Sequence, residues 1–147
     1  MKRFLLITTL ISVMLIGACK TTSPITTQEQ ANDALQEIYN NYRSDLILDG
    51  AKSYTVVRGD TLAAISRAQY NNGFYFPIIM LASSEVVLDP DLIEPGMQLT
   101  VPDLQRNLND AKAKGKIKSF LGEIAGVYDR RDRPQDADGL RDLADTL

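Results

Sequence analysis

Hydrophobic positions divide the chain into four parts with different spacing. Residues 4–18 form an uncharged run dominated by Leu, Ile, Val and Met. Over 28–48 the apolar side chains recur three and four positions apart, which predicts a helix. Residues 54–102 combine two short β-prone runs with two helical ones. Residues 103–147 are strongly charged and show two apolar helical faces, so we expect two helices there.

The centre of the chain predicts the order strand, helix, helix, strand. A β-prone run over 53–57 is followed by a turn, and Asp60 is suited to cap a helix over 61–70. Proline is favoured in a first helical turn, so a second helix is expected over 77–82. Apolar and polar residues alternate over 97–101, which indicates a half-buried strand. If both helices pack on one face, the two strands can pair antiparallel, so we expect an α+β fold.

The N-terminal run is typical of an export signal. It follows a short positive segment and is shorter than the roughly 20 apolar residues of a membrane-spanning helix. It ends in Ile-Gly-Ala-Cys at 16–19, which resembles the lipobox of bacterial lipoproteins. The resemblance implies that residues 1–18 are a signal peptide and that Cys19 carries a covalent lipid. Because Lys20 is not Asp, the resemblance favours the outer membrane. An uncleaved anchor and ordinary secretory cleavage after Ala18 are the alternatives.

Composition excludes several classes of enzyme. The chain of 147 residues has no His and one Cys, so it cannot form a Ser-His-Asp or Cys-His triad or a Cys/His zinc site. Its formal net charge of −3 gives no bulk attraction for nucleic acid. We therefore expect a binding protein rather than an enzyme. We expect no metal, no nucleic-acid partner and no cofactor beyond the lipid on Cys19.

One basic cluster interrupts this acidic balance. It consists of Lys112, Lys114, Lys116 and Lys118. Because a spacing of two is not a helical period, these side chains would spread over more than one helix face. We interpret the cluster as a solvated stretch, with contact to anionic headgroups or peptidoglycan carboxylates as the alternative.

The central segment carries the most specific motifs. Y-T-V-V-R-G-D-T-L at 54–62 and D-P-D-L-I-E-P-G-M-Q-L-T-V-P at 89–102 resemble the LysM domain family over residues 54–102. The resemblance implies a single βααβ module, with a two-stranded antiparallel sheet and two helices on one face. It also implies a shallow groove for N-acetylglucosamine-containing chains, between the first strand–helix loop and the second helix–strand loop. Two departures are Phe76, where many members have Trp, and Ser83, where many have Asn.

The resemblance places the glycan-binding residues on these two loops. The matching positions are Gly59, Asp60, Thr61 and Leu62 on one wall, and Ser83, Pro90, Asp91, Leu92 and Ile93 on the other. Exposed backbone groups would bind the N-acetyl amide, and small apolar pockets made by Leu62 and Ile93 would receive its methyl group. Gly59 would allow the backbone to approach the ligand closely.

Several of these residues also have plainer interpretations. Gly59, Asp60 and Thr61 can form a turn and a helix cap, and Leu62 is expected in the core first. Asp60 with Asp91 could suggest a catalytic carboxylate pair, but a cap and a loop acid are the preferred interpretation. Four aromatic residues, Tyr70, Phe74, Tyr75 and Phe76, could stack on sugars, although core packing is preferred for at least two of them.

The predicted organisation has five parts. They are a signal peptide at 1–18, a flexible spacer at 19–27, a helical segment at 28–50, the LysM domain at 53–103 and a charged helical extension at 104–147. Together they predict a lipid-anchored tether or organiser of the cell envelope. It would bind peptidoglycan non-covalently from the periplasmic face of the outer membrane. The alternative is an assembly or scaffold protein whose flanking helices bind another envelope protein, with the LysM fold as a structural core.

Overall fold

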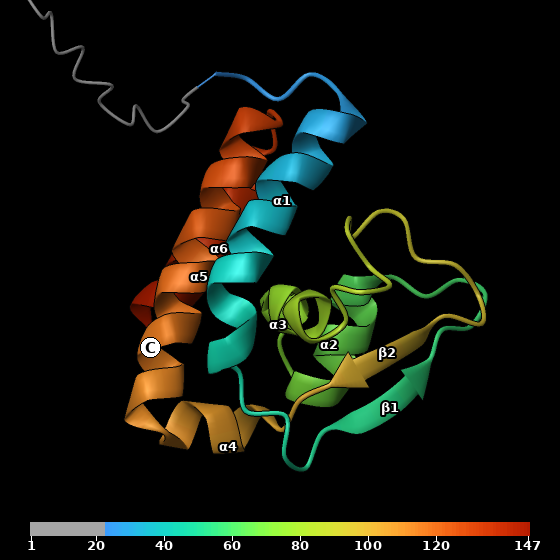
Figure 1. The fold of residues 1–147 in the computed structure, drawn as a ribbon, viewed down its shortest axis with the longest axis vertical. Coiled ribbons are helices and arrows are strands. Elements are labelled where there is room, and N and C mark those ends of the chain that lie inside the picture. Colours follow the sequence, from blue (N-terminus) through green and yellow to red (C-terminus); the bar gives the residue numbers. More distant parts are fainter. Residues whose placement is uncertain (1–22) are drawn as a thin grey trace, which may run out of the picture.

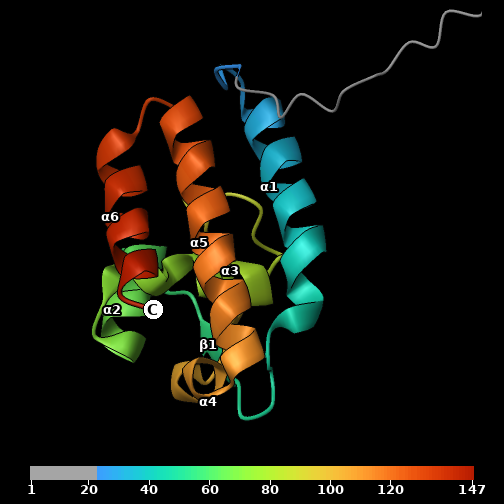
Figure 2. The same ribbon diagram turned by 90° about the vertical axis from the view of Figure 1, so that its left-hand side faces the viewer.

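The computed structural model describes residues 23–147, so the predicted signal peptide and Cys19 lie outside the described residues. Three long helices stand side by side along one flank, and a small sheet with two short helices lies against them (Figures 1 and 2). The helices are α1 (Gln28–Tyr42), α2 (Leu62–Tyr70), α3 (Phe76–Ala82), α4 (Leu104–Asn109), α5 (Ala111–Arg130) and α6 (Pro134–Asp145). The strands are β1 (Lys52–Thr55) and β2 (Gln98–Val101), and single 3₁₀ turns occupy Arg43–Asp45 and Gly73–Tyr75.

The central segment has the predicted α+β order. β1 and β2 pair antiparallel, with Tyr54 opposite Leu99. Pairing continues past the end of β1, because the Val56 amide donates to the Met97 carbonyl (2.9 Å) and the Gly96 amide donates to the Val56 carbonyl (2.8 Å). A two-stranded sheet is marginal by itself. The buried side chains of β2 pack toward α3, which closes the small module.

The cap of α2 differs from the prediction by one residue. Thr61 is the N-cap, since its hydroxyl accepts a hydrogen bond from the Ala64 amide (3.1 Å). Asp60 instead accepts hydrogen bonds from the Val57 amide and the Tyr54 hydroxyl, both at 2.9 Å. Asp60 therefore stabilises the turn between β1 and α2, and the helix begins after it.

The C-terminal region contains three helices in the described structure instead of the predicted two. Asp103 caps α4 by accepting from the Arg106 amide (3.0 Å), and Asp110 caps α5 by accepting from the Ala113 amide (2.8 Å). Asp110 has an extended backbone, which ends α4 where α5 begins. α5 and α6 then run antiparallel, joined at Arg131–Arg133 (Figure 2). Within residues 23–147, no helix has the length and apolar character to cross a bilayer.

The flanking helices and the central module share one hydrophobic core. Phe76 of α3 packs edge-on against Tyr128 of α5, with ring centroids 6.0 Å apart. Phe74 lies against α6 so closely that a Cβ added at Gly139 would overlap its ring. At the N-terminus the Ile25 amide donates to the Arg130 carbonyl (2.8 Å), which attaches the segment before α1 to the end of α5. The helices therefore form part of the folded body around the module.

Candidate functional site

The site residues predicted from the sequence lie on two loops, β1–α2 (residues 56–61) and α3–β2 (residues 83–97). Both loops project from the end of the sheet where β1 ends and β2 begins (Figure 1). Their stems are joined by the hydrogen bonds between Val56 and residues 96 and 97. We call these two loops the loop pair. A hollow of about 320 Å³ lies at the opposite end of the strands, lined in part by Lys52 and Asp103, and contains none of the predicted site residues.

The β1–α2 loop offers open backbone. Gly59 has φ +95°, a conformation that favours glycine, and nothing lies within 4 Å of the position a Cβ would take. Thr61 is exposed and Asp60 is partly exposed. Leu62, by contrast, is only 2% exposed and belongs to the core, so its side chain does not line an open surface.

The α3–β2 loop is divided between buried and exposed residues. Ser83 is 4% exposed, and its hydroxyl accepts from the Thr100 amide (2.9 Å) and donates to the Thr100 carbonyl (3.3 Å). Position 83 therefore joins the end of α3 to β2. Pro90 and Ile93 are half-buried, and Ile93 packs against the core, whereas Leu92 is 55% exposed.

Exposed apolar side chains concentrate on the loop pair. Six large hydrophobic residues are exposed in the described structure, and four of them are Val57, Val86, Leu88 and Leu92. Of these four residues, only Leu92 was predicted from the sequence as a site residue. Val57 could have been inferred from strand alternation, since Val56 points into the core and its neighbour must then point outward. Val86 and Leu88 lie in an irregular loop, for which no periodic pattern exists.

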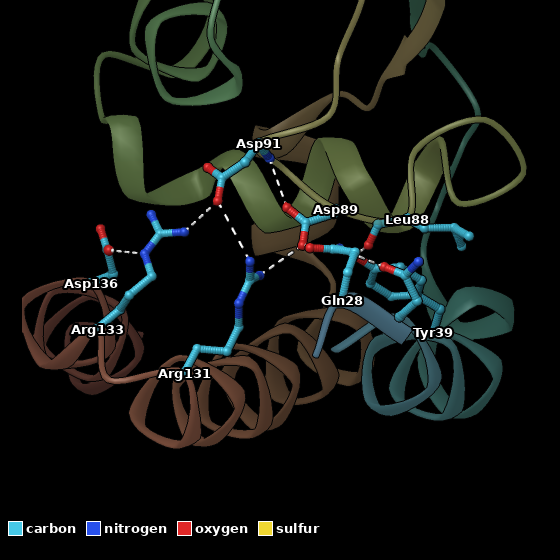
Figure 3. Close-up of polar contacts among 9 residues, drawn as sticks. Gln28, Tyr39, Leu88, Asp89, Asp91, Arg131, Arg133 and Asp136 are labelled. Carbon is cyan, nitrogen blue, oxygen red and sulfur yellow. Dashed lines mark hydrogen bonds and ion pairs between the residues drawn. The ribbon is translucent and has the colours of Figure 1, made fainter. Parts of the chain in front are cut away.

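Acidic residues of the α3–β2 loop face the flanking helices. Asp89 is fully buried and pairs with Arg131 (Oδ2 to Nη1, 2.8 Å), while Asp91 pairs with Arg133 (Oδ2 to Nη1, 2.6 Å) (Figure 3). Asp60 and Asp91 thus have separate partners, Asp60 bonding within its own turn. The hydrogen bond to Asp60 raises the pKa of the Tyr54 hydroxyl. These contacts support the interpretation of Asp60 and Asp91 as residues that stabilise their loops, and not the interpretation as a carboxylate pair.

The four aromatic residues between the end of α2 and the start of α3 (residues 70–76) are engaged in packing. Tyr70 and Tyr75 meet edge-on at 6.0 Å, and the Tyr70 hydroxyl donates to the Pro102 carbonyl (2.9 Å). Burial raises the pKa of both phenols. Phe76 is in the core, and Phe74, though partly exposed, lies against α6.

The basic cluster divides as its spacing predicts. Lys112 and Lys116, one turn apart on α5, both contact the Asp45 carboxylate, at 2.8 and 3.1 Å. Hydrogen bonds from the two ammonium groups lower the pKa of Asp45. Two of the four lysines therefore hold the end of the α1 segment against α5. Within residues 23–147 no group of three His, Cys, Asp or Glu side chains is arranged to hold a metal ion.

Comparison with known proteins identifies the module. Residues 54–102 match the LysM domain family, which confirms the resemblance seen in the sequence. The chain is 42% identical over 50 residues to the "Potassium binding protein Kbp" of Escherichia coli O6:H1 (strain CFT073), a match that covers 34% of each protein. The match thus spans about a third of that relative's length. No solved structure matches the chain. The described structure accordingly contains a LysM domain packed against helices that lie outside the matched segment.

Proposed function

We propose that this chain binds peptidoglycan-type glycans non-covalently through the loop pair of its LysM domain. A LysM domain is a binding module for glycans of the peptidoglycan and chitin type, and residues 54–102 are such a domain. The observation that carries the proposal is the exposure of Val57 (56%) and Leu92 (55%) on the two loops that the family uses for binding.

The chemistry of the loop pair suits N-acetylated sugars. Apolar side chains at Val57 and Leu92 can cover the methyl group and the apolar face of a sugar ring, because removing such surface from water is favourable. Open backbone at Gly59 can exchange hydrogen bonds with the N-acetyl amide. This recognition needs no general acid or base, and we propose no catalytic role for the chain.

We further propose that a lipid on Cys19 anchors the chain to the periplasmic face of the outer membrane. Ile25 is attached to the end of α5, so residues 19–24 alone would link the lipid to the folded body. Six extended residues span at most about 20 Å. Anchoring beside a polymer with repeated sites raises the effective concentration, which makes a weak single site sufficient for a tether or local organiser.

Co-sedimentation with purified sacculi tests glycan binding. The full-length chain in mild detergent is expected to pellet with sacculi, and Val57→Asp and Leu92→Asp are each expected to reduce the pelleted fraction. Leu48→Asp is the matched control, because Leu48 is a large exposed hydrophobic residue (44%) outside the loop pair. If Val57→Asp and Leu92→Asp pelleted with sacculi to the same extent as the control Leu48→Asp, the proposed site would be contradicted.

Lipid attachment is tested separately. Cells expressing the chain are fed a radiolabelled fatty acid, and label is expected in the wild-type chain but not in Cys19→Ser. Label retained by Cys19→Ser would contradict the lipidation proposal without affecting the glycan proposal.

The scaffold alternative makes the opposite prediction for the loop pair. An envelope partner bound by the flanking helices would still be captured by Val57→Asp and Leu92→Asp. The Escherichia coli relative is named for potassium binding, but the match covers only 34% of that protein and so gives no ground for assigning potassium binding to this chain.

A further inference from the structure

The α3–β2 loop is held largely by residues outside the LysM domain. Asp89 Oδ2 accepts from Gln28 Nε2 of α1 (2.8 Å) and pairs with Arg131 at the end of α5 (2.8 Å). Its other carboxylate oxygen accepts from the Asp91 amide (2.9 Å), which fixes the local turn. One fully buried carboxylate therefore joins the loop to α1 and to the α5–α6 connection (Figure 3).

Asp91 makes a second link to the same connection. Its Oδ2 lies 2.6 Å from Arg133 Nη1 and 3.6 Å from Arg131 Nη2. Arg133 is itself fixed, since its Nε bonds to Asp136 Oδ2 (2.8 Å) and its guanidinium lies over the Tyr128 ring, 4.7 Å from the centroid. These two contacts fix the orientation of the Arg133 guanidinium independently of the α3–β2 loop.

The pattern extends to the start of the loop. Glu85 pairs with Arg43, which follows α1 directly. Three of the four acidic residues between 83 and 97 are therefore paired with arginines that lie outside residues 54–102. Charge complementarity joins the loop to the flanking helices, in addition to the shared apolar core.

The α5–α6 connection that carries two of these arginines is a closed turn. The Arg131 amide donates to the Val127 carbonyl (3.1 Å), and the Arg133 amide donates to the Tyr128 carbonyl (2.9 Å). Asp132 between them has φ +58°, a left-handed conformation within this turn. Both guanidinium groups consequently reach the same side, toward the loop (Figure 3).

We propose that Arg131 and Arg133 are positioning residues for the glycan wall at residues 90–93. The inference rests on the proposed function, because it concerns the same loop pair. A buried carboxylate without its cation must be rehydrated, which requires the loop to move. Pro90, Leu92 and Ile93 lie within four residues after Asp89, so movement of Asp89 would shift this wall of the proposed groove away from Gly59 on the other wall. The helical extension is on this account a part of the glycan-binding unit.

Arg133→Gln tests the proposal with a milder substitution than Arg131→Gln. Its partner Asp91 is half-exposed, whereas Asp89, the partner of Arg131, is fully buried. Binding of an N-acetylglucosamine oligomer to the full-length chain in detergent is measured by titration calorimetry. Arg133→Gln is expected to weaken binding about fivefold or more, the usual lower bound for coupling between sites. Arg133→Lys keeps the charge but lacks the Nε bond to Asp136, so its affinity is expected to lie between that of Arg133→Gln and that of the wild type. Hydrogen exchange at residues 88–93 should rise in Arg133→Gln.

Two further variants separate this role from general destabilisation. Arg141→Gln removes a paired arginine from the same α5–α6 unit, since Arg141 pairs with Asp129 and Asp138, and should bind like the wild type. Asp89→Asn combined with Arg131→Gln replaces the buried ion pair by neutral amides, and should bind more tightly than Arg131→Gln alone.

The outcomes separate glycan binding by the loop pair from the positioning role of Arg131 and Arg133. Wild-type protein that binds neither the oligomer nor sacculi would contradict the proposed function itself. Wild-type binding that Arg133→Gln leaves equal to Arg141→Gln would overturn the positioning role alone. A loss in Arg133→Lys as large as in Arg133→Gln would also overturn it, because the ion pair is the proposed agent.

Discussion

Ser83→Ala tests whether position 83 stabilises the module or contacts the glycan. The family resemblance places it on the groove wall, whereas the structure buries its hydroxyl against the backbone of Thr100. The change leaves a backbone N–H without its acceptor, which costs about 1–3 kcal/mol of unfolding free energy. The affinity of the folded protein for an N-acetylglucosamine oligomer should not change. Urea unfolding followed by circular dichroism gives the first quantity, and calorimetry gives the second.

Ser84→Ala is the matched control for this prediction. Ser84 is adjacent and buried, but its side chain makes no hydrogen bond within the described residues. Its unfolding free energy should change by less than about 0.5 kcal/mol. A Ser83→Ala variant as stable as Ser84→Ala would contradict the stabilising role of the Ser83 hydroxyl. Weaker oligomer binding by fully folded Ser83→Ala would show instead that Ser83 contacts the glycan.

Four further predictions concern stability. Gly122→Ala should raise the unfolding free energy by about 1 kcal/mol, because position 122 is an exposed position in α5 with free space around it. Gly139→Ala should give no such gain, because its methyl group would overlap the Phe74 ring, and equal gains in thermal unfolding would contradict this. Asn107→Ala should cost about 1–3 kcal/mol in urea unfolding, since the buried amide side chain bonds to both backbone groups of residue 47; an unchanged midpoint would argue against it. Burial and a neighbouring carboxylate raise the pKa of Tyr42 to about 12, so its stabilising contribution is complete below pH 10 and is lost as pH rises toward 12. An ultraviolet titration of the wild type against a variant with Tyr42→Phe should show one phenol ionising late, and no difference would refute the assignment.

Local signals account for what the sequence predicted correctly. Alternation over 97–101, turn residues after β1 and the proline at the start of α3 are features of neighbouring residues, and they determined the order of the module. The errors were also local. Asp60 and Thr61 are adjacent residues that can each cap a helix, and backbone geometry selected Thr61. The extended backbone at Asp110 divided a stretch whose composition is helical throughout.

Long-range pairing explains what the sequence could not provide. The sequence offered no partner for the charged residues 129–133, and Asp91 was interpreted as a groove residue or a loop acid. Their contact joins positions 42 residues apart, as between Arg133 and Asp91, and no spacing rule links residues at that separation. Leu62 was expected in the core first, and its 2% exposure agrees with that prediction rather than with a pocket on the groove surface.

The attachment of Ile25 to the end of α5 has a mechanical consequence for a tether. Tension between membrane and cell wall would enter the fold at this N-terminal attachment and leave it at the loop pair. Two short routes join these points, one through Gln28 to Asp89 and one through Arg130 and Arg131 to Asp89, and both bypass the strands. The four-residue ladder of β1 and β2 therefore lies off the line of force. Single-molecule pulling between residue 23 and residue 92 should release the Gln28–Asp89 contact before the strands separate, and strand separation as the first event would contradict this load path.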